Sequence, residues 1–184
     1  MTELELLARQ IGANERTLRR AVTEGTLRAV RPTPRTLRID ATEKRYLRRS
    51  WKLLATLRQA LRTEQNVRFA LLFGSAARGD DSLGSDVDLL VEMRDSSSLR
   101  IVDLELKLED LLGRRVDVLA LEDARDDPVL FAEAVAEGRT IVDREGRRGQ
   151  LDSEAGAVAR RARRHLRERS RRALAGIDRL LGEG

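Results

Sequence analysis

The sequence predicts an α+β fold, in which a mixed sheet with flanking helices follows a small helical unit and precedes a long C-terminal helix. Three observations lead to this prediction. Apolar runs of strand length alternate with amphipathic helical segments over residues 66–143. Residues 1–40 hold two short helical patterns and two extended runs, and residues 144–184 are amphipathic at helical spacing with an Arg-rich outer face. Residues 41–65 connect the first two segments as a single helix.

The first 40 residues contain the start and stop signals of two helices. Thr2–Glu5 forms a capping box, and Asn14 can cap a second helix that ends at Gly25. The extended runs 26–30 and 36–39 follow and predict a small hairpin. Helix, tight turn, helix and hairpin is the order of a winged helix-turn-helix, whose second helix enters the major groove of DNA.

The sequence of residues 17–27 and 35–39 resembles the excisionase and MerR-type helix-turn-helix families. The resemblance implies DNA contacts from the second helix and from the hairpin. The residues that would make them are Arg16, Arg19 and Arg20 on the helix and Arg35 or Arg38 on the hairpin. The alternative is a helical lid or dimerisation element whose arginines form a solvated face.

A long helix is expected from Thr42 to about Gln65, with an apolar stripe that includes Trp51. Trp51 has apolar neighbours one turn away on either side, which favours packing over base stacking. After this helix the pattern predicts strands at residues 67–73, 87–93, 116–121 and 140–143, with helices at residues 99–112 and 128–137. The last helix, from Leu151 to about Leu181, would pack across the core or against a second copy of the chain, or serve as a nucleic-acid arm.

The chemistry is concentrated between the first two of these strands. The first strand leads into Gly74-Ser75, and ten residues later the second begins with Asp86-Val87-Asp88. Because side chains alternate across a strand, the two aspartates point to the same side. Two adjacent carboxylates cannot easily both stay ionised without a cation, and hard oxygen ligands suit Mg²⁺. The pattern predicts phosphoryl-type transfer, with Asp86 and Asp88 holding two metal ions about 4 Å apart.

Gly74 and Ser75 are suited to contacting a triphosphate. A glycine lets the backbone approach phosphate oxygens without a Cβ in the way, and Ser75 offers a hydroxyl and a helix-start N–H. Arg78 can add a bidentate phosphate contact or be a solvated turn residue.

The Gly-Ser pair followed by Asp-x-Asp resembles the DNA polymerase β-type nucleotidyltransferase superfamily, and most closely its minimal nucleotidyltransferase branch, over residues 66–143. In that family a third carboxylate on a later strand completes the metal site or accepts the proton of the attacking hydroxyl. Asp117 matches its position. Minimal members transfer AMP from ATP to hydroxyls and act as antitoxins against HEPN-type toxins. The resemblance therefore implies ATP or another NTP as substrate, Mg²⁺ as cofactor and a protein acceptor.

Two other functions remain open. The first is a DNA-binding regulator whose nucleotidyltransferase fold senses nucleotide, which is compatible with an antitoxin that represses its own operon. The second is a catalytically inactive scaffold, which the complete set of site residues argues against. The only histidine, His165, is expected to be a surface residue, so no histidine general base is expected.

The composition limits the class of protein. The chain has no cysteine, so disulfides and Cys-ligated metals are excluded, and no apolar run of membrane-spanning length or signal segment is visible. We therefore expect a cytoplasmic protein. Its net charge of +5 is uneven, because residues 1–40 carry 8 arginines and 5 acids, residues 101–143 carry 5 basic and 12 acidic residues, and residues 144–184 carry 12 arginines and 6 acids. Basic ends suit a polyanionic partner, although such Arg enrichment can also reflect genomic base composition.

Overall fold

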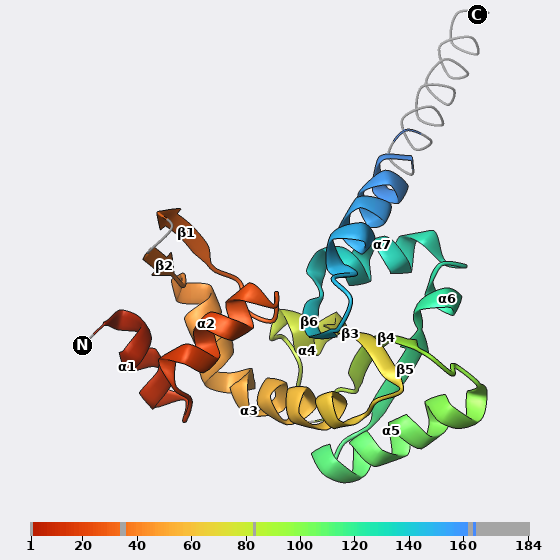
Figure 1. The fold of residues 1–184 in the computed structure, drawn as a ribbon, viewed down its shortest axis with the longest axis horizontal. Coiled ribbons are helices and arrows are strands. Elements are labelled where there is room, and N and C mark those ends of the chain that lie inside the picture. Colours follow the sequence, from red (N-terminus) through yellow and green to blue (C-terminus); the bar gives the residue numbers. More distant parts are fainter. Residues whose placement is uncertain (1, 34–35, 83, 162–163, 165–184) are drawn as a thin grey trace, which may run out of the picture.

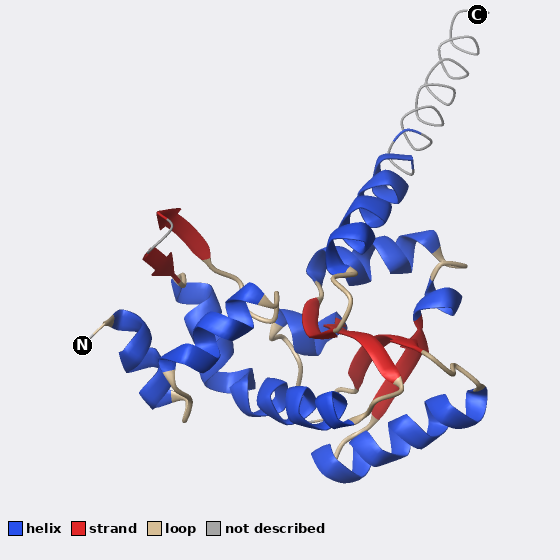
Figure 2. Cartoon of the chain, in the orientation of Figure 1, coloured by secondary structure: helices blue, strands red, loops and turns tan. Residues whose placement is uncertain are grey.

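The computed structural model describes residues 2–33, 36–82, 84–161 and 164 (Figures 1 and 2). The helices are α1 (Glu3–Gln10), α2 (Glu15–Thr23), α3 (Ala41–Thr63), α4 (Gly74–Arg78), α5 (Ser98–Leu112), α6 (Leu121–Ala124) and α7 (Pro128–Glu137). The strands are β1 (Val30–Thr33), β2 (Thr36–Arg38), β3 (Val67–Phe73), β4 (Val87–Met93), β5 (Val116–Ala120) and β6 (Arg139–Asp143). Residues 148–161 form a further helical segment. These elements confirm the predicted α+β class.

The N-terminal unit consists of α1, α2 and the β1–β2 hairpin. The capping box at Thr2 is present, since its hydroxyl accepts the N–H of Glu5 while the Glu5 carboxylate accepts the N–H of Thr2. The side chain of Asn14 caps α2 by accepting the N–H of Thr17 at 2.7 Å. Gly12, between the helices, has a positive φ of 70°. The order helix, turn, helix, hairpin is therefore present in the structure.

The first hairpin strand was predicted in the wrong place. It was expected at residues 26–30, but β1 begins at Val30 and includes Pro32. Residues 25 and 26 instead attach to the central sheet. The buried hydroxyl of Thr26 donates to the carbonyl of Thr140 at 2.6 Å, and the N–H of Thr140 donates to the carbonyl of Gly25 at 3.2 Å. Pro32 is tolerated in β1 because a two-stranded hairpin leaves the outer edges of both strands unpaired.

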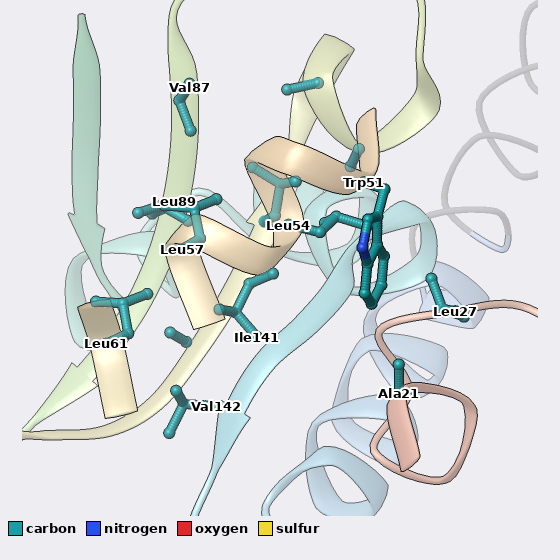
Figure 3. Packing of buried hydrophobic residues seen from close by; sticks show 14 of the residues in the cluster. Ala21, Leu27, Trp51, Leu54, Leu57, Leu61, Val87, Leu89, Ile141 and Val142 are labelled. Carbon is teal, nitrogen blue, oxygen red and sulfur yellow. The ribbon is translucent and has the colours of Figure 1, made fainter. Parts of the chain in front are cut away.

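Helix α3 joins the N-terminal unit to the sheet and packs along both. Figure 3 shows Leu54, Leu57 and Leu61 directed at residues of β4 and β6. Trp51 lies in the same buried cluster at 7% exposure, which confirms its prediction as a packing residue. The cluster extends without a break from Leu4 in α1 to Leu108 in α5. The N-terminal unit and the central sheet therefore share one hydrophobic core.

The central sheet has four strands in the order β5-β4-β3-β6. Strand β3 pairs antiparallel with both β4 and β6, whereas β4 and β5 are parallel, so the sheet is mixed as predicted. Alternating residues face opposite sides. Leu89 and Val91 join the α3 and α5 side, while Leu90 joins a second cluster with α6, α7 and helix 148–161. Asp88, two residues before Leu90, belongs to this second face.

Strand β5 is an edge strand whose outward N–H groups are bound by the helix that precedes it. The carboxylate of Glu109 accepts the N–H of Val116 at 3.1 Å, and that of Glu105 accepts the N–H of Val118 at 3.0 Å. These bonds satisfy backbone donors that an edge strand otherwise leaves open. They also fix β5, which carries Asp117, against α5.

Two further predictions concern the C-terminal part. Helix α7 begins at Pro128 as expected, with Asp127 as its N-cap. The short helix α6 was not predicted. The final helix begins at residue 148, three residues earlier than expected, and residues 165–184 of its predicted course, including His165, lie outside the described residues. Across the described ranges, no helix is both long enough and apolar enough to span a membrane.

Candidate active site

The turn between β3 and α4 brings Gly74 against Asp88. Strands β3 and β4 pair Phe73 with Asp88, so the first residue after β3 lies beside that carboxylate. Gly74 adopts a φ of 67°, a conformation that disfavours any residue with a Cβ. A Cβ at this position would overlap Oδ2 of Asp88. Conformation and space therefore both require glycine at position 74.

Asp88 lies near two further carboxylates, those of Asp117 and Asp86. Asp88 is paired in register with Asp117 on the neighbouring parallel strand β5, and Asp86 lies two residues before Asp88. The pKa of Asp88 is raised, first by partial burial and then by the negative charges of Asp117 and Asp86. The positive charges of Arg78 and Arg114 offset part of this effect. The site thus concentrates negative charge that a cation would neutralise.

The aspartates do not form a closed metal site in the described residues, where no three acidic, His or Cys groups gather tightly enough to hold one ion. Asp86 and Asp88 are half-buried, whereas the side chain of Asp117 is 57% exposed and lies 3.8 Å from Nη2 of Arg115. Asp117 is therefore the most accessible of the three carboxylates.

Ser75 and Arg78 lie on α4, directly after Gly74. Ser75 is half-buried, and its carbonyl accepts the N–H groups of Gly79 at 2.8 Å and Asp80 at 3.2 Å, which closes the end of this short helix. Arg78 is exposed and ion-paired, with Asp80 at 3.2 Å and with Glu137 of α7 at 3.0 Å. A phosphate contact by Arg78 would have to replace or share these pairs.

Arg114 contributes to the site and was missed by the sequence reasoning. Its guanidinium donates to the carbonyls of Ser85 and Asp86 and forms an ion pair with Asp81 at 3.1 Å. It therefore holds the loop that leads into Asp86. No local pattern indicated this role, because the partners lie about 30 residues earlier in the chain.

The arginines expected to contact DNA lie apart from the aspartates, in the N-terminal unit. Arg16, Arg19, Arg20 and Arg38 are exposed, and Arg35 lies outside the described residues. Arg19 pairs with Glu15 at 2.5 Å and Arg20 with Glu24 at 2.7 Å, both one turn away on the same chain. These residues thus present an exposed, partly neutralised surface.

Comparison with known families identifies the central part of the chain. The family described as polymerase beta nucleotidyltransferase matches residues 55–147, from the second half of α3 through β6. The chain belongs to this family. The match includes the predicted nucleotidyltransferase segment 66–143 and begins earlier, within the connecting helix.

Curated relatives of this nucleotidyltransferase domain are named as protein-modifying enzymes. A putative protein adenylyltransferase of Methanocaldococcus jannaschii is 44% identical over 57 residues, which are 30% of this chain and 61% of the relative. The protein adenylyltransferase MntA of Thermococcus cleftensis is 41% identical over 68 residues, 36% of this chain and 69% of the relative. Among solved structures, a toxin-antitoxin crystal structure with AMP-PNP is 21% identical, with a TM-score of 0.49, over 67% of this chain and 97% of that one.

The nucleotidyltransferase family implies a divalent metal ion, and the residues present suit one. All three carboxylates are hard oxygen donors of the kind Mg²⁺ prefers. The pKa of Asp88 is raised by partial burial and then by the charges of Asp117 and Asp86, so a cation beside it would favour its ionised form. Gly74 leaves the space beside Oδ2 of Asp88 free of a side chain. Asp86 and Asp88 therefore fit a metal-binding pair.

Proposed function

We propose that this protein is a Mg²⁺-dependent nucleotidyltransferase that transfers AMP from ATP to a hydroxyl group of a protein acceptor. The observation that carries the proposal is the packing of the Gly74 backbone against Asp88, with Asp117 paired in register beside Asp88 and Asp86 two residues before it. A glycine turn beside paired carboxylates lets a triphosphate approach closely where metal ions can be held. Adenylyl transfer to protein is supported by the names of the relatives.

Each group has a defined role in the proposed reaction. Asp86 and Asp88 would hold Mg²⁺, which when bound supplies positive charge to the triphosphate and the leaving group. Gly74 and Ser75 would contact phosphate oxygens, and Arg78 would add positive charge nearby. The acceptor oxygen forms a bond to the α-phosphorus, the bond from that phosphorus to the bridging oxygen breaks, and pyrophosphate leaves. Asp117, the exposed carboxylate, would take the proton of the acceptor hydroxyl or act as a third metal ligand.

The class of acceptor is a further part of the proposal. The names of the relatives point to a protein acceptor, and a HEPN-type toxin is the acceptor we would test first, since minimal members of the superfamily act as antitoxins. In this role the protein would neutralise its toxin by adding AMP to a hydroxyl side chain.

The experiment is incubation of the full chain with labelled ATP, CTP, GTP or UTP and Mg²⁺. It is run with the protein alone, with lysate and with a HEPN-type toxin, and label on protein or RNA is followed. We expect transfer from ATP to protein, lost when Mg²⁺ is chelated and in the Asp86→Ala/Asp88→Ala double variant. Absence of transfer from every nucleotide by folded protein would contradict the proposal, and label on RNA would refute the acceptor class.

A second function is favoured by the N-terminal unit. Its order of helix, turn, helix and hairpin, with exposed Arg16, Arg19 and Arg20 on α2, suits DNA binding. We propose that this unit binds operator DNA and allows the protein to repress its own operon. If transfer is absent, the same unit would make the protein a DNA-binding regulator whose nucleotidyltransferase fold senses nucleotide or acts as a scaffold.

A further inference from the structure

Helix α4, which carries Gly74 and Ser75, is too short to be stable alone. It has five residues, and a helix of this length cannot repay the cost of its first turn with its own hydrogen bonds. Its C-terminal carbonyls need partners from elsewhere. Side chains from α3 and β6 supply them. The hydroxyl of Tyr46 donates to the carbonyl of Ala76 at 3.1 Å, and Nε of Arg139 donates to that of Ala77 at 2.7 Å.

Arg139 is fixed on all sides. Its side chain is 2% exposed, and its terminal nitrogens bind both carboxylate oxygens of Glu43 in α3, at 2.6 and 2.9 Å. One of these nitrogens also donates to the carbonyl of Thr26 in the N-terminal unit at 3.3 Å. The planar guanidinium serves three segments at once, which the single ammonium of a lysine cannot do with the same geometry.

Tyr46 completes the arrangement. Its ring lies under the guanidinium of Arg139, with 3.5 Å between Cζ and the ring centroid. Burial raises the pKa of Tyr46 to about 12, so its hydroxyl stays protonated and remains a donor at neutral pH. The ring also contacts the residue that ends α4, since a Cβ at Gly79 would lie 2.7 Å from Cδ2 of Tyr46.

Stability alone gives little reason for a buried ion pair at this position. Removing two charges from water costs free energy that their attraction often fails to recover, and apolar residues of similar size frequently stabilise a protein as well or better. What an apolar pair cannot provide is a hydrogen-bond donor aimed at the carbonyl of Ala77. Glu43 supplies the charge and geometry that keep the guanidinium aimed there.

We infer that Arg139 and Tyr46 are positioning residues for nucleotide binding, and that Glu43 orients Arg139. They hold the C-terminal end of α4, and thereby set where its other end, Gly74 and Ser75, lies relative to Asp88. The inference rests on the proposed function for the identity of the ligand, a nucleoside triphosphate. Neither residue was singled out by the sequence, because Arg139 lies 62 residues from Ala77 and Tyr46 lies 30 residues from Ala76.

The test uses the full chain with Glu43→Met and Arg139→Met combined, which removes the charges together and leaves an apolar pair. We expect the variant to fold with a lower melting temperature, because the carbonyls of Thr26 and Ala77 and the N–H of Arg28 lose their partners. We expect the Kd for AMP-PNP with Mg²⁺, measured by calorimetry, to rise about ten-fold, the change expected if α4 occupies its binding-competent position only about one-tenth of the time. The KM for ATP in the transfer assay should rise in parallel, with a smaller change in kcat.

A matched control is the ion pair between Arg147 and Glu92, which is also bidentate, at 2.9 and 2.8 Å, and does not contact α4. Replacing both residues by methionine should leave the Kd for AMP-PNP unchanged. Tyr46→Phe is a second, milder variant, which keeps the ring under Arg139 and removes the hydroxyl that donates to Ala76 and also bonds Ser50. It should raise the Kd about three-fold, the change expected if α4 keeps its binding-competent position about one-third of the time.

The outcomes separate the two proposals. A folded Glu43→Met/Arg139→Met variant with unaltered affinity would overturn the inference, as would an equal loss in the Arg147 and Glu92 control. If the double variant does not fold, the Tyr46→Phe variant provides the test, and an unaltered Kd for AMP-PNP in that variant would overturn the inference. If the unaltered chain binds AMP-PNP and the variants weaken binding while no transfer occurs, the positioning role stands and the proposed enzymatic function fails.

Discussion

The nucleotidyltransferase site and the N-terminal arginine surface are built in opposite ways. At the site, strand register and a glycine turn fix Asp88 beside Gly74 and Asp117. On α2, Arg19 and Arg20 are exposed and held only by acids one turn away. Transfer at a phosphorus atom requires reacting groups that are held in fixed positions, whereas binding to the phosphate backbone of DNA requires mainly positive charge. The candidate site can therefore be argued from its geometry, whereas the arginine surface needs a binding measurement.

The largest effect is expected at the carboxylates. Replacing Asp86 and Asp88 together with alanine should reduce nucleotidyl transfer by at least about a hundred-fold. Because the pKa of Asp88 is raised by burial and by its acidic neighbours, removing the charges relieves repulsion, and the melting temperature should be equal or higher. Transfer assays and thermal unfolding on the same preparation measure both. Full activity in the double variant would refute the site, and DNA binding, if present, should be unaffected.

The next largest effect is expected for Gly74→Ala. An alanine at this position would have to adopt a left-handed backbone conformation, and its Cβ would overlap Oδ2 of Asp88. We expect destabilisation of about 1–3 kcal/mol and a strong loss of AMP-PNP binding. Gly113→Ala is a suitable control, because it has a similar φ of 65° but open space around its Cβ. Equal loss of nucleotide binding in both variants would show that strain alone, and not the contact with Asp88, is responsible.

A smaller effect tests the N-terminal surface. Replacing Arg19 and Arg20 with alanine should weaken binding to promoter-proximal DNA about ten-fold at low salt and reduce its salt dependence, because fewer phosphates are neutralised. Nucleotidyl transfer should not change. Arg68, a half-buried arginine of β3 that pairs with Glu145, provides the control for charge alone when it is replaced by alanine. Electrophoretic shifts at several salt concentrations measure the affinity for DNA and its salt dependence. Absent or salt-insensitive binding of the unaltered chain would rule out the DNA-binding role.

The smallest effect concerns the attachment of the N-terminal unit to α3. Burial acts to raise the pKa of Glu24, but the hydrogen bond from Arg20 and the charges of Arg58 and Arg62 outweigh it, so the pKa is lowered. A lowered pKa in the folded state means that ionised Glu24 stabilises the protein above the pKa of the unfolded chain, and that this contribution is lost as pH falls through the folded value.

Glu24→Gln should therefore lower the melting temperature by about 2 °C at neutral pH, a small value because the group is partly solvated. The difference from the unaltered chain should shrink as the pH is lowered from about 7 to about 3. Thermal unfolding across this range measures it. A difference that stays constant with pH would show that Glu24 does not contribute through its charge.

The sequence predicted most of the fold because its signals are local. The Asn14 cap, the Pro128 helix start and the apolar stripe with Trp51 depend on residues within a few positions of one another. The start of β1 was predicted wrongly because it depends on a contact with a residue far away in the sequence. Residues 26–29 read as a strand, but Thr26 is bound to Thr140, 114 residues away. No local pattern contains that contact.

The candidate site was predictable for a similar reason. Gly74, Ser75, Asp86 and Asp88 lie within a strand-turn-strand unit, so that spacing alone placed them together. Arg114, Tyr46 and Arg139 act on this unit from other elements, through contacts made only after the chain has folded. The sequence thus indicated which groups the proposed chemistry would use and left open which groups hold them in place.

The continuous core from α1 to α5 affects how this protein can be divided. The helix-turn-helix and hairpin pattern ends near residue 40. Even so, Leu7, Leu18 and Leu27 before this position and Leu47 after it belong to one buried cluster. Cutting the chain there would expose this apolar surface on both pieces, and neither would keep its full set of contacts. We therefore expect the chain to melt in one cooperative transition, and a fragment lacking the first 40 residues to be prone to aggregation.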